Sequence, residues 1–104
     1  MGKLIELENN NDFKEIIKEG KTLVDFFAIW CGPCQMMKPL VDKLAEESAD
    51  LKVVAVDVDK FPDIASDYQV MSIPTFVVFV NGEAKESRNG AMSEADLKKW
   101  VEKV

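Results

Sequence analysis

Two cysteines three positions apart follow directly after a run of apolar residues, and this arrangement constrains the chain most. Residues 22–28 are apolar almost throughout, as expected for a strand buried on both faces of a sheet, and Cys31 and Cys34 come just after them. Side chains at i and i+3 lie one turn apart on one face of a helix. The sequence therefore predicts a central strand that leads into a helix, with two thiols at the junction.

Cysteines at this spacing can alternate between a dithiol and a disulfide. The unpaired backbone N–H groups at a helix N-terminus favour negative charge, and the thiolate is the reactive form of cysteine. Cys31, expected at the exposed start of the helix, is therefore predicted to be the nucleophile. Cys34, one turn further in, is predicted to be the resolving thiol.

The cysteine pair has three other interpretations. A structural zinc site needs about four ligands, and with two cysteines and no histidine it would require two carboxylates or a second chain to complete it. A structural disulfide here would close a very short loop and stabilise little. Two ordinary buried cysteines would leave Gly32 and Pro33 between them unexplained. No metal or organic cofactor is expected, and a cysteine hydrolase that uses a histidine is excluded.

Length and charge limit the organisation and the partners. The 104 residues suffice for one hydrophobic core, so residues 1–104 are predicted to form a single domain and a monomer. The formal charge of -6 argues against nucleic acid or an anionic membrane as partner. No stretch resembles a signal peptide or a membrane span. With one isolated dithiol, a reducing, cytoplasmic compartment is expected.

Strand and helix patterns alternate along the chain. The predicted strands cover residues 4–7, 22–28, 51–58, 75–80 and 85–88. The apolar faces of the four predicted helices are Phe13, Ile16 and Ile17; Met37, Leu40, Val41, Leu44 and Ala45; Phe61, Ile64, Ala65 and Tyr68; and Leu97, Trp100, Val101 and Val104. This order, βαβαβα and then ββα, predicts an α/β fold with helices on both faces of the sheet.

Local signals refine the element boundaries. The first helix is expected to be capped by Asn11 or Asp12 and to end at Gly20. Pro39 is expected to bend the second helix without ending it. Asn81-Gly82 predicts a tight hairpin between antiparallel strands, and Ser93 is expected to cap the last helix.

Several short motifs, taken in order, resemble the thioredoxin family over nearly the whole chain. They are Val24-Asp25-Phe26, Trp30-Cys31-Gly32-Pro33-Cys34, Lys38-Pro39, Val56-Asp57-Val58-Asp59, Ser72-Ile73-Pro74-Thr75 and Gly90-Ala91. The resemblance implies the thioredoxin fold, a central mixed β-sheet of about five strands flanked by four helices. It also implies a thiol-disulfide oxidoreductase that reduces oxidised proteins and is recharged by a thioredoxin reductase.

Asp25 is a predicted proton carrier. A carboxylate inside a buried strand loses hydration, which raises its pKa. The resemblance gives it the role of helping to deprotonate Cys34. The alternative is a structural carboxylate paired with a nearby lysine at the sheet edge. Many members of the family that the chain resembles have a buried lysine near this aspartate, where this chain has Ala55, so the tuning of Asp25 is expected to differ.

The resemblance also assigns residues around the dithiol. Gly32 and Pro33 form the spacer of the reducing family members, and a cis Ile73-Pro74 bond would present backbone to an extended substrate. The predicted substrate-binding residues are Trp30, Ile73, Pro74, Gly90 and Ala91. Departures from the usual family pattern are Phe27, Ile29 and Asn89.

Two rival functions remain at this point. The same apolar surface could serve a docking or chaperone subunit that needs no redox chemistry, or the pair could donate a disulfide as an oxidant. A docking subunit would keep its function after loss of both thiols, whereas a reductase would not. The redox potential of the cysteine pair distinguishes a disulfide donor from a reductase.

Overall fold

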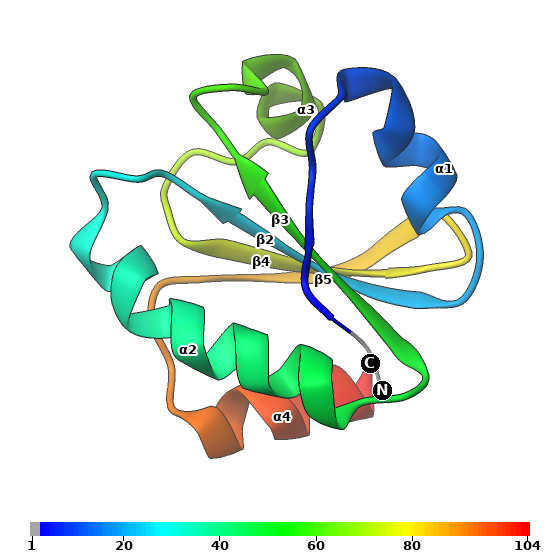
Figure 1. Ribbon diagram of the computed structural model, residues 1–104, viewed down its shortest axis with the longest axis vertical. Coiled ribbons are helices and arrows are strands. Elements are labelled where there is room, and N and C mark those ends of the chain that lie inside the picture. Colours follow the sequence, from blue (N-terminus) through cyan, green and yellow to red (C-terminus); the bar gives the residue numbers. More distant parts are fainter. Residues whose placement is uncertain (1–2) are drawn as a thin grey trace.

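A mixed β-sheet forms the centre of the molecule, with helices on both sides (Figure 1). The computed structural model describes residues 3–104; Met1 and Gly2, the start of the predicted domain, lie outside the described part. Within that part the elements are β1 (Ile5–Glu6), a 3₁₀ turn (Asn10–Asp12), α1 (Phe13–Ile17), β2 (Lys21–Phe27), α2 (Gly32–Glu47), β3 (Leu51–Asp57), α3 (Pro62–Asp67), β4 (Thr75–Val80), β5 (Glu83–Asn89) and α4 (Glu94–Lys103). The predicted fold of five strands and four helices is confirmed.

The strand order β1-β3-β2-β4-β5 places β2 in the middle of the sheet. β1 and β2 both pair with β3 in parallel, whereas β4 runs antiparallel to β2 and β5 antiparallel to β4. The five central residues of β2 are all buried, which explains their nearly continuous apolar sequence. The carboxyl end of this buried strand carries the cysteine pair, where open α/β sheets usually place their sites.

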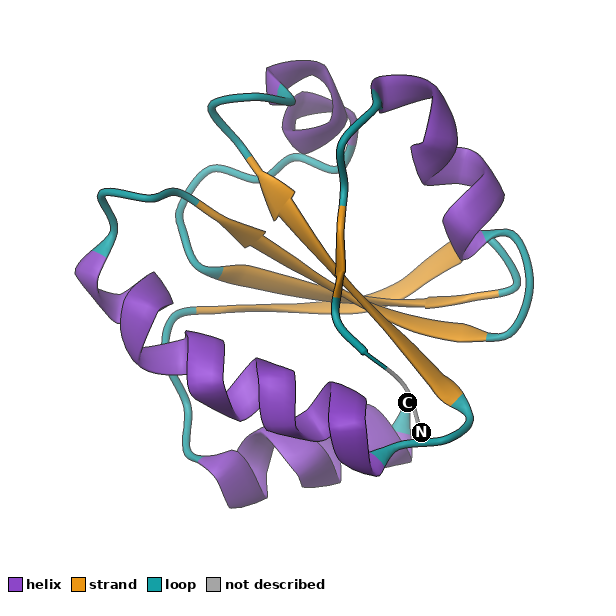
Figure 2. Ribbon diagram, in the orientation of Figure 1, coloured by secondary structure: helices purple, strands orange, loops and turns teal. Residues whose placement is uncertain are grey.

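Helices cover both faces of the sheet (Figure 2), and a cluster of buried hydrophobic residues fills the space between the sheet and the helices on each face. α1 and α3 pack on one face through Phe13, Ile17, Ile64 and Ala65. α2 and α4 pack on the other face, with buried residues Met37, Val41, Leu44, Ala45, Leu97, Trp100 and Val101. Because successive strand residues alternate between faces, Asp25 shares the α2 and α4 face with Leu23.

α2 begins at the cysteine pair and continues through Pro39, as predicted. Pro33 lies in its first turn, where a missing N–H leaves no helix hydrogen bond unmade. None of the helices within residues 3–104 combines the length and the apolar character needed to cross a membrane.

The start of the first helix differs from the prediction. The side chain of Asn9 accepts a hydrogen bond from the backbone N–H of Asn11 at 2.9 Å and so caps the 3₁₀ turn that leads into α1. Asp12 occupies the N-cap position of α1 but makes no side-chain capping bond. The predicted N-cap position is therefore correct at Asp12, but the side-chain capping bond is made by Asn9 and belongs to the preceding turn. α1 also ends at Ile17, three residues before Gly20.

The two remaining local predictions are confirmed. Asn81 and Gly82 both have positive φ, 50° and 86°, as a type I′ hairpin requires. Ser93 accepts the backbone N–H of Asp96 at 3.1 Å and caps α4.

Candidate active site

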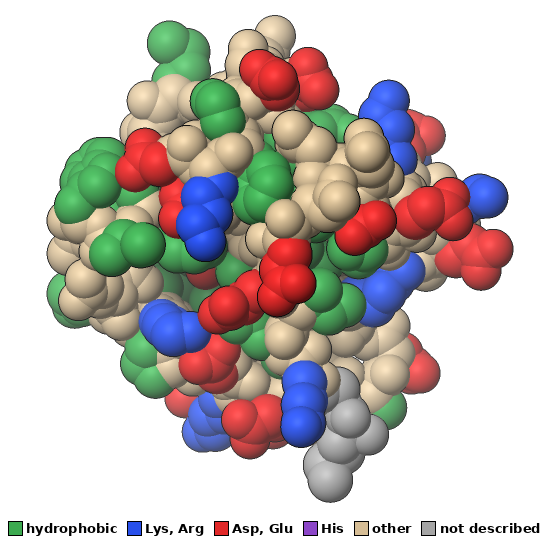
Figure 3. All heavy atoms as spheres, turned by 45° about the horizontal axis from the view of Figure 1, so that its top comes forward, with side chains coloured by type: hydrophobic (Ala, Val, Ile, Leu, Met, Phe, Trp, Pro, Cys, Tyr) green, Lys and Arg blue, Asp and Glu red, His purple; other side chains and the backbone are tan. Residues whose placement is uncertain are grey.

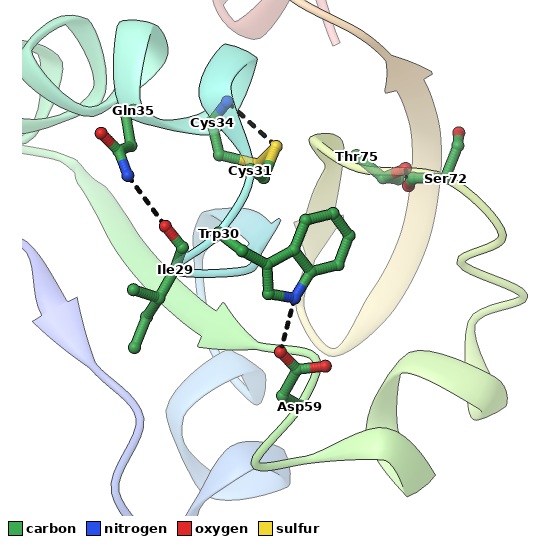
Figure 4. Close-up of a disulfide and its surroundings, with 8 residues drawn as sticks. All are labelled: Ile29, Trp30, Cys31, Cys34, Gln35, Asp59, Ser72 and Thr75. Atoms are coloured by element: carbon green, nitrogen blue, oxygen red, sulfur yellow. Dashed lines mark hydrogen bonds between the residues drawn. A yellow bond between two sulfur atoms is a disulfide. The ribbon is translucent and has the colours of Figure 1, made fainter.

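The cysteine pair lies where β2 gives way to α2, and the two side chains are joined by a disulfide (Figure 4). Cys31 is the N-cap residue of α2, and its Sγ accepts the backbone N–H of Cys34 at 3.1 Å. An N–H aimed at a sulfur atom stabilises negative charge on it once the disulfide is reduced. The local geometry therefore favours a thiolate at Cys31.

The expected exposure of Cys31 is wrong for the disulfide form. Cys31 and Cys34 are each 4% exposed. They form a small buried cluster with Ala28, and the half-buried Phe27, Val58 and Ile73 pack against it. Val58 and Ile73 come from distant parts of the chain, and Ala28 comes from the loop before the helix. The position of Cys31 at the helix end therefore did not determine its burial. Gly32 and Pro33, between the cysteines, are exposed.

Asp25 is a buried acid in the middle of β2. It is 6% exposed, and its Oδ1 has no hydrogen-bond partner among residues 3–104. Burial raises its pKa from 3.8 to about 7, against a smaller lowering by the charge of Lys38, while Asp42 adds to the rise. The predicted rise is confirmed, and no lysine within residues 3–104 forms an ion pair with Asp25.

A cavity of about 400 Å³ connects the buried acid to the buried cysteine. Its lining residues are Glu6, Asp25, Phe27, Ile29, Cys34, Gln35, Lys38 and Pro39. Cys34 belongs to this lining and Cys31 does not, so the cavity distinguishes two cysteines that are equally buried. Cys34 and Asp25 therefore face a common cavity on this side of the disulfide.

Four large apolar side chains of residues 3–104 are strongly exposed, and two of them, Ile29 and Trp30, directly precede Cys31. Ile29, Trp30, Met36 and Met71 are all strongly exposed, at 69%, 72%, 71% and 93%. Figure 3 shows hydrophobic side chains gathered at its left side, over the junction of β2 and α2, whereas charged side chains of both signs are scattered elsewhere on that face. Such a patch on a small protein is typical of a surface that binds other proteins.

The indole of Trp30 is held in place from another loop. Its Nε1 donates to Asp59 Oδ2 at 2.9 Å (Figure 4), and the backbone N–H of Asp59 donates to Asp57 Oδ1 at 2.9 Å. The motif that contains Asp57 and Asp59 was noted in the sequence, but its contact with Trp30 was not predicted. On the other side of the loop, Gln35 Nε2 donates to the carbonyl of Ile29 at 2.8 Å.

The Ile73-Pro74 peptide bond is cis, as the resemblance implied. Ile73 packs against the cysteine cluster, and the carbonyl of Pro74 accepts the N–H of Gly90 at 2.8 Å. Gly90 has φ of 87°, a conformation that favours glycine. The structure thus brings Ile73 to the disulfide and Gly90 to Pro74, while Ala91 is exposed beyond them.

Three polar side chains near this segment were not predicted as a group. Asn89 Nδ2 donates to Ser72 Oγ and Thr75 Oγ1. The sequence marked Asn89 only as a departure from the family pattern, and an unusual polar residue at the end of a strand was the available signal. No group of three possible metal-ligating side chains occurs within the described residues.

Comparisons with known proteins agree with this geometry. A family model described as thioredoxin matches residues 3–103. The chain is 41% identical over 102 residues to a chloroplastic M-type thioredoxin of Pisum sativum, covering 95% of this chain and 59% of that protein. It is 38% identical over 97 residues to a thioredoxin of Rickettsia felis, covering 90% and 92% of the two chains.

Solved structures are similar over nearly the whole chain. A mutant thioredoxin from Halobacterium salinarum superimposes with a TM-score of 0.91 at 36% identity, covering 97% of this chain and 89% of that one. A thioredoxin of Schistosoma mansoni gives a TM-score of 0.88 at 39% identity, covering 97% and 94%.

Proposed function

The chain belongs to the thioredoxin family, and from this premise we propose that it is a general protein-disulfide reductase working through Cys31 and Cys34. The observation that carries the proposal is the disulfide at the start of α2, with the Cys34 N–H directed at Cys31 Sγ. As a thiol-disulfide oxidoreductase, the protein exchanges two electrons with its substrate and needs no bound cofactor for that step.

In the first step, the Cys31 thiolate attacks one sulfur of a substrate disulfide. The substrate S–S bond breaks, a mixed disulfide with Cys31 forms, and the other substrate sulfur leaves as a thiolate that takes up a proton. The contact from the Cys34 N–H to Cys31 Sγ supports this assignment because it stabilises the attacking anion.

In the second step, Cys34 attacks Cys31 Sγ. The mixed disulfide breaks, the Cys31–Cys34 disulfide forms, and the second substrate sulfur leaves. Cys34 must first lose its proton, and Asp25 is the proposed acceptor because both side chains line the same cavity and the pKa of Asp25 is close to neutrality. The substrate gains two electrons and the protein loses two.

Substrate docking is assigned to the surface around the disulfide. We infer that Trp30, Ile73, Pro74, Gly90 and Ala91 contact an extended substrate segment. The support is the exposed indole, the packing of Ile73 against the cysteines and the bond between Gly90 and Pro74. We also infer that Gly32 and Pro33, which lie between the two cysteines, tune the redox potential of the cysteine pair.

Turnover requires that the disulfide be reduced again. A thioredoxin reductase is the proposed electron donor, and oxidised proteins are the proposed substrates. A single domain over residues 1–104, a monomeric state and a cytoplasmic location stay predictions; similar proteins include both bacterial and chloroplastic thioredoxins.

Reduction of insulin disulfides by the pre-reduced protein tests the proposal. Stoichiometric reduction, about one substrate disulfide per dithiol, is expected, and the Cys31→Ser variant should have no activity. The equilibrium potential against glutathione should be reducing; a strongly oxidising potential would instead indicate a disulfide donor.

A docking function without redox chemistry is the second candidate, favoured by the exposed Ile29, Trp30, Met36 and Met71. The double variant Cys31→Ser/Cys34→Ser discriminates the two. A docking subunit keeps its cellular function without the thiols, whereas a reductase loses it.

A further inference from the structure

Asn89, the last residue of the edge strand β5, holds the segment that carries the cis peptide bond. It lies opposite Thr75 in the register of β4 and β5. Its Nδ2 donates to Ser72 Oγ at 2.8 Å and to Thr75 Oγ1 at 3.2 Å, and Thr75 Oγ1 donates to the Ser72 carbonyl at 2.6 Å. One amide group therefore joins both ends of residues 72–75.

This segment lies between the end of α3 and the start of β4, and Ser72, Ile73 and Pro74 precede the strand. Ile73 nevertheless packs on the cysteine cluster, and Figure 4 shows Ser72 and Thr75 in the surroundings of the disulfide. Ser72 and Ile73 are not paired in a strand, so hydrogen bonds from side chains help to fix the backbone there. Asn89 supplies two of the bonds, and an apolar side chain at this position could supply neither.

We propose that Asn89 is a positioning residue for substrate docking, which holds the Ser72–Pro74 backbone in the orientation that receives an extended protein segment. The proposal rests on the proposed reductase function and deepens it. Asn89 makes no hydrogen bond to either cysteine in the described structure. Its effect is therefore on the binding of protein substrates and not on the exchange of sulfur bonds.

The Asn89→Val variant tests this separation. A neutral hydrogen bond contributes modestly, so loss of two should raise KM for insulin about three- to tenfold, with kcat within about twofold of the parent. Reduction of dithiobis(nitrobenzoate), a small aromatic disulfide without a peptide segment, should be unchanged. Ser87→Val is the matched control, because Ser87 is also exposed on β5, two residues away, with no such bonds to the segment.

Ser72→Ala provides the second arm, since it removes one acceptor of the Asn89 amide. It should also raise KM for insulin, and the double variant Asn89→Val/Ser72→Ala should raise KM by less than the product of the two single effects. If Asn89→Val fails to fold, Ser72→Ala alone decides the question, and an unchanged KM would overturn the proposal.

Other outcomes are equally decisive. Equal slowing with insulin and with the small disulfide would place the effect at the sulfur chemistry and overturn the proposal, as would the same KM increase in Ser87→Val. In these cases the parent still reduces insulin, so the reductase function stands. A parent protein that reduces the small disulfide but not insulin would instead refute the reductase function itself.

Discussion

Asp25 on β2 lies directly across from Ala55 on β3, so the position opposite the buried acid on the neighbouring parallel strand carries no charge. On its other side, Asp25 lies opposite Phe76 of β4. Ala55 in turn lies opposite Glu6 of β1. The charged groups that act on Asp25 from α2 are Lys38 and Asp42. The charge environment of Asp25 is therefore set by the helix and the cavity, not by a lysine in the sheet.

Asp25→Ala should make the protein more stable at neutral pH. The folded-state pKa, about 7, lies above the unfolded value near 3.8, so the folded state binds more protons between them and stability falls as pH rises through that window. The difference corresponds to about 4 kcal/mol above pH 7, offset in the variant by about 1–2 kcal/mol for the lost buried atoms. We expect a net gain of about 2 kcal/mol at pH 8 and a net loss of about 1 kcal/mol at pH 4, where the lost buried atoms dominate, measured by urea unfolding.

A matched control for that measurement is Asp57→Ala. Asp57 is also buried, at 7% exposure, but its Oδ1 accepts the N–H of Asp59. Removing a hydrogen-bonded carboxylate should destabilise by about 1–3 kcal/mol. If Asp25→Ala were destabilising to the same degree at pH 8, Asp25 would be a structural acid and not a proton carrier.

The same Asp25→Ala substitution should slow the resolving step. Without the base in the cavity, Cys34 must lose its proton to solvent, so release of the mixed disulfide should slow at least about tenfold. The ratio of the parent rate to the variant rate should be largest below pH 7. It should decrease above pH 7, where hydroxide deprotonates Cys34 in the variant. Stopped-flow measurement of the second step across pH tests this; equal rates at every pH would remove Asp25 from the mechanism.

Lys38 should tune Asp25 in place of a lysine in the sheet. Lys38→Met removes the attraction that lowers the pKa of Asp25, so this pKa should rise further, whereas Asp42→Asn should lower it. Ala55→Lys should also lower the pKa of Asp25. In the Ala55→Lys background, Lys38→Met should raise the pKa of Asp25 by less than it does in the parent. The titration of the Asp25 carboxyl carbon by NMR reports all three.

Lys43→Met is the control for the tuning experiment. Lys43 also lies on α2, but it pairs with Glu94 at 2.9 Å and is not part of the cavity lining. This variant should leave the titration of Asp25 unchanged. A shift as large as that of Lys38→Met would mean that general charge on α2, and not the position of Lys38, sets the pKa.

Cys34→Ser should capture substrate as a stable mixed disulfide on Cys31. The first attack needs only Cys31, whereas release needs the second thiol. Mass spectrometry under non-reducing conditions should show the adduct with Cys34→Ser and none with Cys31→Ser. The opposite pattern would reverse the roles assigned from the Cys34 N–H contact and the cavity.

Gly82→Ala should weaken the hairpin between β4 and β5. Gly82 has φ of 86°, and an added Cβ would meet the backbone of Lys18 no closer than 3.7 Å, so the cost comes from the backbone conformation and not from a clash. We expect a loss of about 1 kcal/mol in urea unfolding. Gly32→Ala, which has neither positive φ nor a neighbour within 4 Å of the added Cβ, should change stability little.

Local sequence patterns predicted most of the fold and part of the site. Residues 75–80 formed β4 as predicted, and the apolar face of α2 was predicted correctly because helix periodicity specifies which side is buried. The raised pKa of Asp25 followed from its apolar strand neighbours. These features depend on residues close together in the chain.

Features that depend on distant segments were not predictable in this way. Cys31 is buried partly by Ile73, more than forty positions away, and no local pattern encodes that contact. The partners of Asn89 and of Trp30 likewise come from other loops. The side chain that caps the first helical turn was not predicted for a different reason: residues 9–12 are all Asn or Asp, and a side chain of either type can cap a turn.

The two edges of the sheet have a consequence for the behaviour of the protein at high concentration. All seven residues of β5 are exposed, among them Glu83, Lys85, Glu86 and Arg88, while β1 at the other edge has two residues. A charged edge and a very short edge both disfavour the addition of a further strand. Copies of the protein are thereby kept from extending one another's sheets, and a concentrated solution of the protein should resist growth of β-fibrils.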